Sequence, residues 1–145
     1  MITSVKDRPM TNTPHVRGPL GSVVLPVEAE SAHLAREWLG LIFDAWSLSE
    51  TENAQLCVSE LVANAATHAH DSGDTMRVVV RRFAGKVRVD VYDRSTDLPK
   101  INRSMEMSES GNGLFLVDAI AGSGQWGFHP VHTGKCVWFA IPAGE

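Results

Sequence analysis

The sequence is poor in several residue types, and each shortage excludes a class of protein. Its 145 residues contain only two cysteines, Cys57 and Cys136, which form no C-x-x-C pair and lie within apolar patterns. We therefore expect reduced core thiols in a cytoplasmic protein rather than a disulfide scaffold. No apolar run approaches the roughly 20 residues that cross a bilayer, and the first residues lack the apolar segment of a signal peptide. A membrane partner is not expected.

An excess of basic residues is also missing. The chain has 13 Lys and Arg against 17 Asp and Glu, a formal net charge of −4. Because non-specific nucleic-acid binding needs a positive surface, direct binding to nucleic acid is not expected. The remaining composition, with 43% hydrophobic and 21% charged residues, is typical of one soluble globular domain.

The chain divides into a short tail and one domain. Residues 1–20 carry three prolines and few large apolar side chains, which predicts a flexible N-terminal tail before a single domain over 21–145. The order of strands and helices in that domain predicts an α+β two-layer sandwich, with a mixed, mostly antiparallel sheet covered on one face by helices. The expected elements are a strand over 22–27, helices over 29–46 and 49–70, strands over 76–83 and 86–93, a helix over 114–121, and strands over 125–128 and 136–141.

Three polar side chains recur at every fourth residue of the second expected helix. Glu60, Asn64 and His68 share one helical face, among mostly apolar neighbours. This row either meets solvent or lines a ligand site. For a ligand site, a carboxylate that can take a proton and an amide oxygen that can hold a hard cation suit Mg²⁺ bound together with substrate phosphates. A zinc site fits less well, because no second histidine stands at ligand spacing on this face.

Three later features also point to chemistry. Asp93 continues the buried valine face of the expected strand 86–93, so its carboxylate should have a partner. Residues 94–110 form a long segment without a sustained period, which is typical of a lid or a binding loop. Gly111 and Gly113 then open a helix, where backbone amides can approach an anion. These glycines belong to neither a Rossmann fingerprint nor a Walker A loop.

Four blocks of sequence stand in a characteristic order. They are the E-L-V-x-N-A-x-x-H-A run over 60–69, V-Y-D-R-S over 91–95 with Leu98-Pro99, G-N-G-L-F-L-V over 111–117, and G-K-C-V-W-F over 134–139. Together they resemble the GHKL ATPase superfamily, and within it the small anti-sigma-factor serine/threonine kinases and their actinobacterial relatives. The resemblance spans about residues 22–142. It implies a Bergerat-type ATP-binding fold with ATP and Mg²⁺ as ligands.

The resemblance implies a role for each matching residue. Glu60 would be the general base, and Asn64 would hold Mg²⁺ against the ATP phosphates. Asp93 would accept a hydrogen bond from the adenine amino group. Gly111 and Gly113 would let the loop close over the phosphates. His68 matches a family position and would cap the site by a hydrogen bond.

Three positions depart from the family pattern. Ser95 replaces the glycine of a D-x-G block, a change that many actinobacterial relatives share. Asn112 replaces an arginine that is common between the two later glycines, which removes a charge-assisted contact near the phosphates. Cys136 replaces a threonine near the adenine and is a weaker hydrogen-bonding partner. These changes bear on affinity and turnover more than on the fold.

The resemblance implies a function, and the departures add an alternative. The first is an anti-sigma-factor-type serine/threonine protein kinase that binds ATP and regulates transcription by partner switching. It would hold a sigma factor in one state and phosphorylate a small antagonist protein in the other. The alternative, favoured by the three departures, is a catalytically weak or inactive regulatory module of the same fold that binds protein partners without phosphotransfer. The catalytic domain of a histidine kinase is disfavoured, because the chain leaves no room for a helical phosphoacceptor domain. A homodimer is also compatible with the resemblance.

Overall fold

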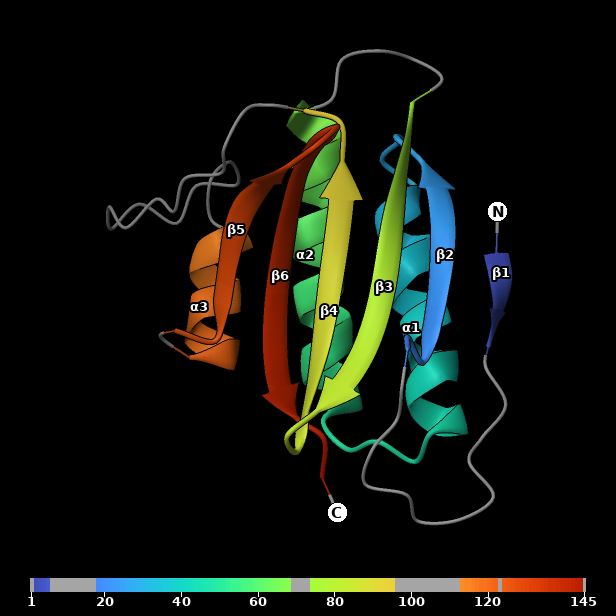
Figure 1. Cartoon of the computed structure of the whole chain (residues 1–145), viewed down its shortest axis with the longest axis vertical. Coiled ribbons are helices and arrows are strands. Elements are labelled where there is room, and N and C mark those ends of the chain that lie inside the picture. Colours follow the sequence, from blue (N-terminus) through green and yellow to red (C-terminus); the bar gives the residue numbers. More distant parts are fainter. Residues whose placement is uncertain (1, 6–17, 69–73, 96–112, 123, 145) are drawn as a thin grey trace.

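One antiparallel sheet with helices on one face forms the described part of the chain (Figure 1). The computed structural model describes residues 2–5, 18–68, 74–95, 113–122 and 124–144. Its elements in chain order are β1 (Ile2–Val5), β2 (Gly21–Pro26), α1 (Ser31–Ala45), α2 (Thr51–His68), β3 (Thr75–Phe83), β4 (Lys86–Asp93), α3 (Gly113–Ala121), β5 (Trp126–Val131) and β6 (Gly134–Pro142).

The six strands lie in the order β1-β2-β3-β4-β6-β5, and each described pairing is antiparallel. In Figure 1, α1 lies behind β2 and β3, α2 lies behind β4 and β6, and α3 lies beside β5. The predicted two-layer α+β sandwich is therefore confirmed, while the sheet is antiparallel rather than mixed in its described part. Among the described helices, none is both long enough and apolar enough to cross a membrane.

The closing hairpin is longer than the sequence suggested. β5 was expected to end at residue 128, but it continues to Val131, which pairs with Gly134 across a two-residue turn. The sequence does not predict this extension, because Pro130 is unfavourable within a strand. Proline is tolerated here because β5 is the last strand of the described sheet, so one of its edges pairs with no described strand.

Residues 1–20, which the sequence predicts to be a flexible tail, include the first strand of the sheet. β1 pairs antiparallel with β2 at the other edge of the sheet. Its Ile, Thr and Val residues favour strand conformation. The three prolines of residues 1–20 favour a flexible tail instead, and the prediction followed them. Leu20, at the end of the expected tail, is fully buried in the core. Residues 6–17 lie outside the described part.

The hydrophobic core fills the space between the sheet and the helices. Because strand side chains alternate between the two faces, every second residue of each central strand enters this core. For β4 and β6 these residues are Val87, Val89, Val91, Val137, Phe139 and Ile141. Residues of the opposite parity face the side of the sheet that the helices leave open, which we call the helix-free face.

Both cysteines are free and fully buried, as predicted. Burial raises the pKa of Cys57 to about 12, with a further contribution from the nearby carboxylate of Glu60. Burial also raises the pKa of Cys136 to about 12, and there the additional contribution comes from Asp90. Neither thiol is therefore suited to act as a nucleophile near neutral pH.

Candidate functional site

The candidate site lies at the end of the sheet where β4 finishes and β6 begins. Asp93, the last residue of β4, stands opposite Lys135, the second residue of β6. This end of the sheet is at the top of Figure 1, where the C-terminal end of α2 lies behind the two strands. The helix contacts both strands. Side chains from α2 and from β4 can therefore line one site from two layers.

Asp93 is the buried carboxylate that strand parity predicted. The residue is 4% exposed and lies on the same face of β4 as the three core valines. Its Oδ1 accepts hydrogen bonds from Lys135 Nζ at 3.0 Å and from the backbone N–H of Ser95 at 2.7 Å. Its Oδ2 is buried and has no hydrogen-bond partner among the described residues. Since an unpaired buried acceptor costs free energy, Oδ2 is suited to receive a donor from a ligand.

Lys135 is the site residue that the sequence reasoning missed. Its side chain is 1% exposed, although lysine is almost never fully buried unless it is paired. It forms an ion pair with Asp93. The signal was present in the sequence, because Lys135 continues the buried face of Val137 and Phe139 just as Asp93 continues that of the valines in β4.

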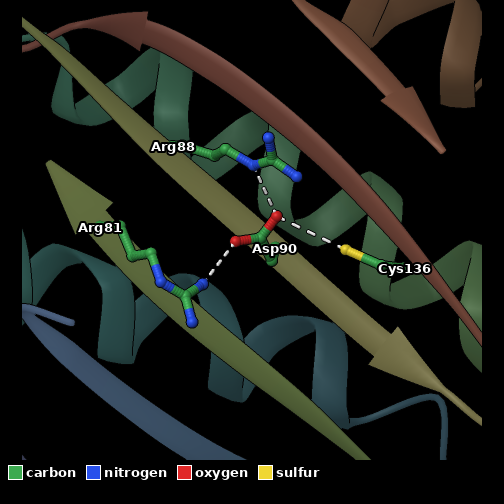
Figure 2. A network of polar contacts seen from close by, with 4 residues as sticks. All are labelled: Arg81, Arg88, Asp90 and Cys136. Atoms are coloured by element: carbon green, nitrogen blue, oxygen red, sulfur yellow. Dashed lines mark hydrogen bonds and ion pairs between the residues drawn. The ribbon is translucent and has the colours of Figure 1, made fainter. Parts of the chain in front are cut away.

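Cys136 lies on the opposite face of the sheet from Asp93. Neighbouring residues of a strand point to opposite faces, and Lys135 takes the face of Asp93. The thiol of Cys136 instead donates to Asp90 Oδ1 at 3.5 Å (Figure 2). The thiol therefore points away from the carboxylate of Asp93.

A polar cluster surrounds Asp90 on the helix-free face, and we call it the Asp90 cluster: Arg81, Arg88, Asp90 and Cys136 (Figure 2). Arg81 Nη1 donates to Asp90 Oδ2 at 2.9 Å, and Arg88 Nε donates to Oδ1 at 2.8 Å. Both oxygens of this carboxylate are therefore occupied. The Arg88 guanidinium also lies 4.3 Å from the centroid of the Trp138 ring, a cation–π contact.

The polar row of α2 lies at the margin of the core. Glu60 and Asn64 are half-buried, and each is followed by a buried residue. Gly113, the first residue of α3, lies directly against Glu60, because a Cβ atom at this glycine would be 2.8 Å from Glu60 Oε1. The structure thus brings Glu60 and Gly113 together. His68 ends α2, but its side chain lies outside the described part, as do Gly111 and Asn112.

Comparison with known proteins agrees with this arrangement. A family model described as a histidine kinase-like ATPase domain matches residues 25–141. The matched span contains all three helices, the strands β3, β4 and β5, most of β6 and the last two residues of β2. It therefore contains every candidate residue of the site. A search of the curated proteins found no match.

Proposed function

Because the chain belongs to the family of histidine kinase-like ATPase domains, we propose that it binds ATP with Mg²⁺ and acts as an anti-sigma-factor-type serine/threonine protein kinase. The main observation in support of a nucleotide site is the buried Oδ2 of Asp93, which has no hydrogen-bond partner among the described residues. A carboxylate oxygen only accepts hydrogen bonds, and the amino group of adenine is a donor. The ligand that the family implies therefore fits the unmet requirement of this site.

The half-buried side chains of α2 are suited to the phosphate end of the ligand. Asn64 would hold Mg²⁺ through its amide oxygen, and the bound ion would neutralise negative charge on the phosphates. Glu60 lies one turn earlier on the same helix and would take the proton of the attacking hydroxyl group. The absence of a side chain at Gly113 leaves room for this carboxylate between α2 and α3.

The partner proteins follow from the sequence blocks shared with the anti-sigma-factor kinases. In one state the protein would hold a sigma factor, and in the other it would phosphorylate a serine or threonine of a small antagonist protein. Transcription would then be regulated in the cytoplasm by partner switching. A homodimer is compatible with this proposal.

A second function has its own supporting observation. Asp93 already has a buried cation partner in Lys135, so the pair also suits a purely structural role. A chain of that kind would keep the fold and bind protein partners without phosphotransfer. Ser95, Asn112 and Cys136 favour this regulatory module, since each departs from the kinase pattern.

Titration calorimetry with and without Mg²⁺, together with transfer of labelled phosphate to candidate antagonists, tests the proposal. Glu60→Gln should abolish transfer while ATP binding stays within about twofold, because the lost group acts on the proton and not on the nucleotide. Asn64→Ala should remove the dependence of binding on Mg²⁺. Glu52→Gln is the matched control, since Glu52 is an exposed residue in the first turn of α2.

The outcomes separate the two functions. Phosphate transfer that Glu60→Gln abolishes and Glu52→Gln preserves supports the kinase. ATP binding and capture of partners without any transfer supports the regulatory module. If the wild-type chain shows no Mg²⁺-dependent binding of ATP, the kinase proposal is wrong.

A further inference from the structure

We propose that Lys135 is a positioning residue for the nucleotide base. By holding one oxygen of Asp93, it leaves the other as a fixed, charged acceptor, and it thereby makes the site prefer adenine to 6-oxopurines. The inference rests on the proposed binding of ATP and assigns a role to a residue that the sequence motifs left without one. Three features of the structure carry it: the hydrogen bonds of Asp93, the burial of the ion pair, and the backbone packing that brings the two residues together.

The hydrogen bonds of Asp93 are unequally divided between its two oxygens. Oδ1 accepts from both Lys135 Nζ and the Ser95 backbone N–H, whereas Oδ2 accepts from no described residue. Rotation of the carboxylate would break both bonds of Oδ1. The lysine and the backbone amide together therefore fix the direction in which Oδ2 points, as supporting groups do in preorganised binding sites.

The burial of the pair determines the chemistry of Oδ2. The side chains of Asp93 and Lys135 are each 1% exposed, so water contributes little to stabilising either charge. The Lys135 ammonium beside the carboxylate offsets part of the cost of burying it. With Oδ1 bonded to Lys135 and to the Ser95 amide, Oδ2 is the acceptor left for a ligand. The amino group at position 6 of adenine meets this requirement, whereas the 6-oxo group of hypoxanthine or guanine presents a second acceptor.

The backbone beside the pair brings the two residues into register. Gly134 precedes Lys135, and a Cβ atom at this glycine would overlap the carbonyl oxygen of Asp93 and lie 2.6 Å from the Cα atom of Arg94. The start of β6 can therefore approach the end of β4 only with glycine at this position. This close approach sets Lys135 opposite Asp93 in the antiparallel pair.

Two other roles for Lys135 predict different results. If the lysine competes with the base for Asp93, its removal should raise the affinity for ATP. If the pair is purely structural, its removal should lower the stability of the nucleotide-free protein and leave the selectivity for the base unchanged. A positioning role predicts a loss of selectivity.

The test compares the affinities of the full chain for ATP and ITP, which share every group except those at positions 1 and 6 of the base. Calorimetry would give both dissociation constants for the wild type, Lys135→Met and Lys135→Gln. We expect the wild type to prefer ATP by about tenfold or more, the equivalent of one hydrogen bond to a charged group. Lys135→Met should bring the ratio close to one, because Asp93 loses its charge partner and its fixed orientation. Lys135→Gln keeps a donor but no charge and should give an intermediate ratio.

Arg81→Met is the matched control, since it removes a cation from Asp90 on the opposite face and should leave the ratio unchanged. The unfolding free energy of each nucleotide-free variant separates stability from selectivity. If Lys135→Met does not fold, Lys135→Gln alone decides the test.

An unchanged ratio in the folded lysine variants, or a higher affinity for ATP, would overturn the inference while ATP binding itself stands. A wild type that binds no ATP would instead refute the proposed function, and the inference with it.

Discussion

Two buried carboxylates three residues apart on β4 have opposite surroundings. Asp90 lies on the helix-free face with both oxygens occupied by the Asp90 cluster (Figure 2), whereas Asp93 faces the helices with one oxygen unpaired among the described residues. Both carboxylates are paired with cations. The difference shows that burial and an ion pair do not by themselves mark a ligand site; the distinguishing feature is an acceptor without a partner.

The cations of the two carboxylates also differ in their access to water. The side chains of Arg81 and Arg88 are 41% and 28% exposed, so each can be hydrated if Asp90 is lost. Lys135 is 1% exposed, so water cannot hydrate its ammonium group if Asp93 is lost. The Asp90 cluster should therefore tolerate change better than the pair formed by Asp93 and Lys135.

The largest expected effect is on stability. Asp93→Ala leaves a buried ammonium group without its partner and should lower the unfolding free energy by about 3–5 kcal/mol. Asp90→Ala should cost less, about 1–3 kcal/mol, because it removes hydrogen bonds but leaves arginines that can turn to water. Urea denaturation of the nucleotide-free chain measures both values. If Asp90→Ala costs as much as Asp93→Ala, the exposure of the cations does not determine how much stability is lost with each carboxylate.

The second prediction concerns selectivity for the base. In Asp93→Asn, an amide N–H can replace the free acceptor, which would disfavour the amino group of adenine and favour a 6-oxo group. We expect about a tenfold or greater loss of affinity for ATP and a preference that shifts toward ITP. Asp90→Asn, the matched change on the other face, should leave both affinities within about twofold. Equal effects of the two variants would show that Asp93 acts through the fold rather than on the base.

The sequence predicted where several residues of the candidate site lie. Alternation along 86–93 identified Asp93, and the four-residue spacing identified Glu60 and Asn64 on one face of a helix. The helix predicted over 114–121 is also present and begins one residue earlier, at Gly113. Local periodicity sufficed in these cases because each conclusion concerned a single strand or helix.

The missed features depend on pairing between distant segments. The partnership of Lys135 with Asp93 requires the β4–β6 register, which no local pattern encodes. The contact of Cys136 with Asp90 depends on the same register, which places the thiol on the helix-free face. β1 was missed because a short edge strand gains its stability from its neighbour rather than from its own sequence.

The third prediction concerns the two thiols, whose pKa values are both about 12. Each thiol binds its proton more tightly in the folded chain than in the unfolded chain. Its contribution to stability is therefore complete below about pH 9 and is lost as the pH rises toward 12, by up to about 1.4 kcal/mol per pH unit. Unfolding measured from pH 8 to 11, with Cys57→Ala and Cys136→Ala for comparison, isolates each contribution.

A substitution at Asp90 tests whether the two thiols respond to different neighbours. Because its charge helps to raise the pKa of Cys136, Asp90→Asn should lower that pKa and leave Cys57 unaffected. Thiolate absorbance in single-cysteine variants measures the change. An equal shift at both thiols would mean that the substitution loosens the whole fold.

The smallest expected effect is on the rim of the Asp90 cluster. Arg88→Met removes one hydrogen bond to Asp90 and the contact with the Trp138 ring, yet Asp90 keeps its bond to Arg81. We expect the unfolding free energy to fall by about 1 kcal/mol, since the cation–π contact is partly exposed and contributes at the lower end of its range. The affinities for ATP and ITP should not change, because the arginine lies across the sheet from Asp93. A loss of nucleotide affinity in this variant would show that the two faces of β4 are coupled. The Asp90 cluster would then contribute to nucleotide binding from the opposite face of the sheet.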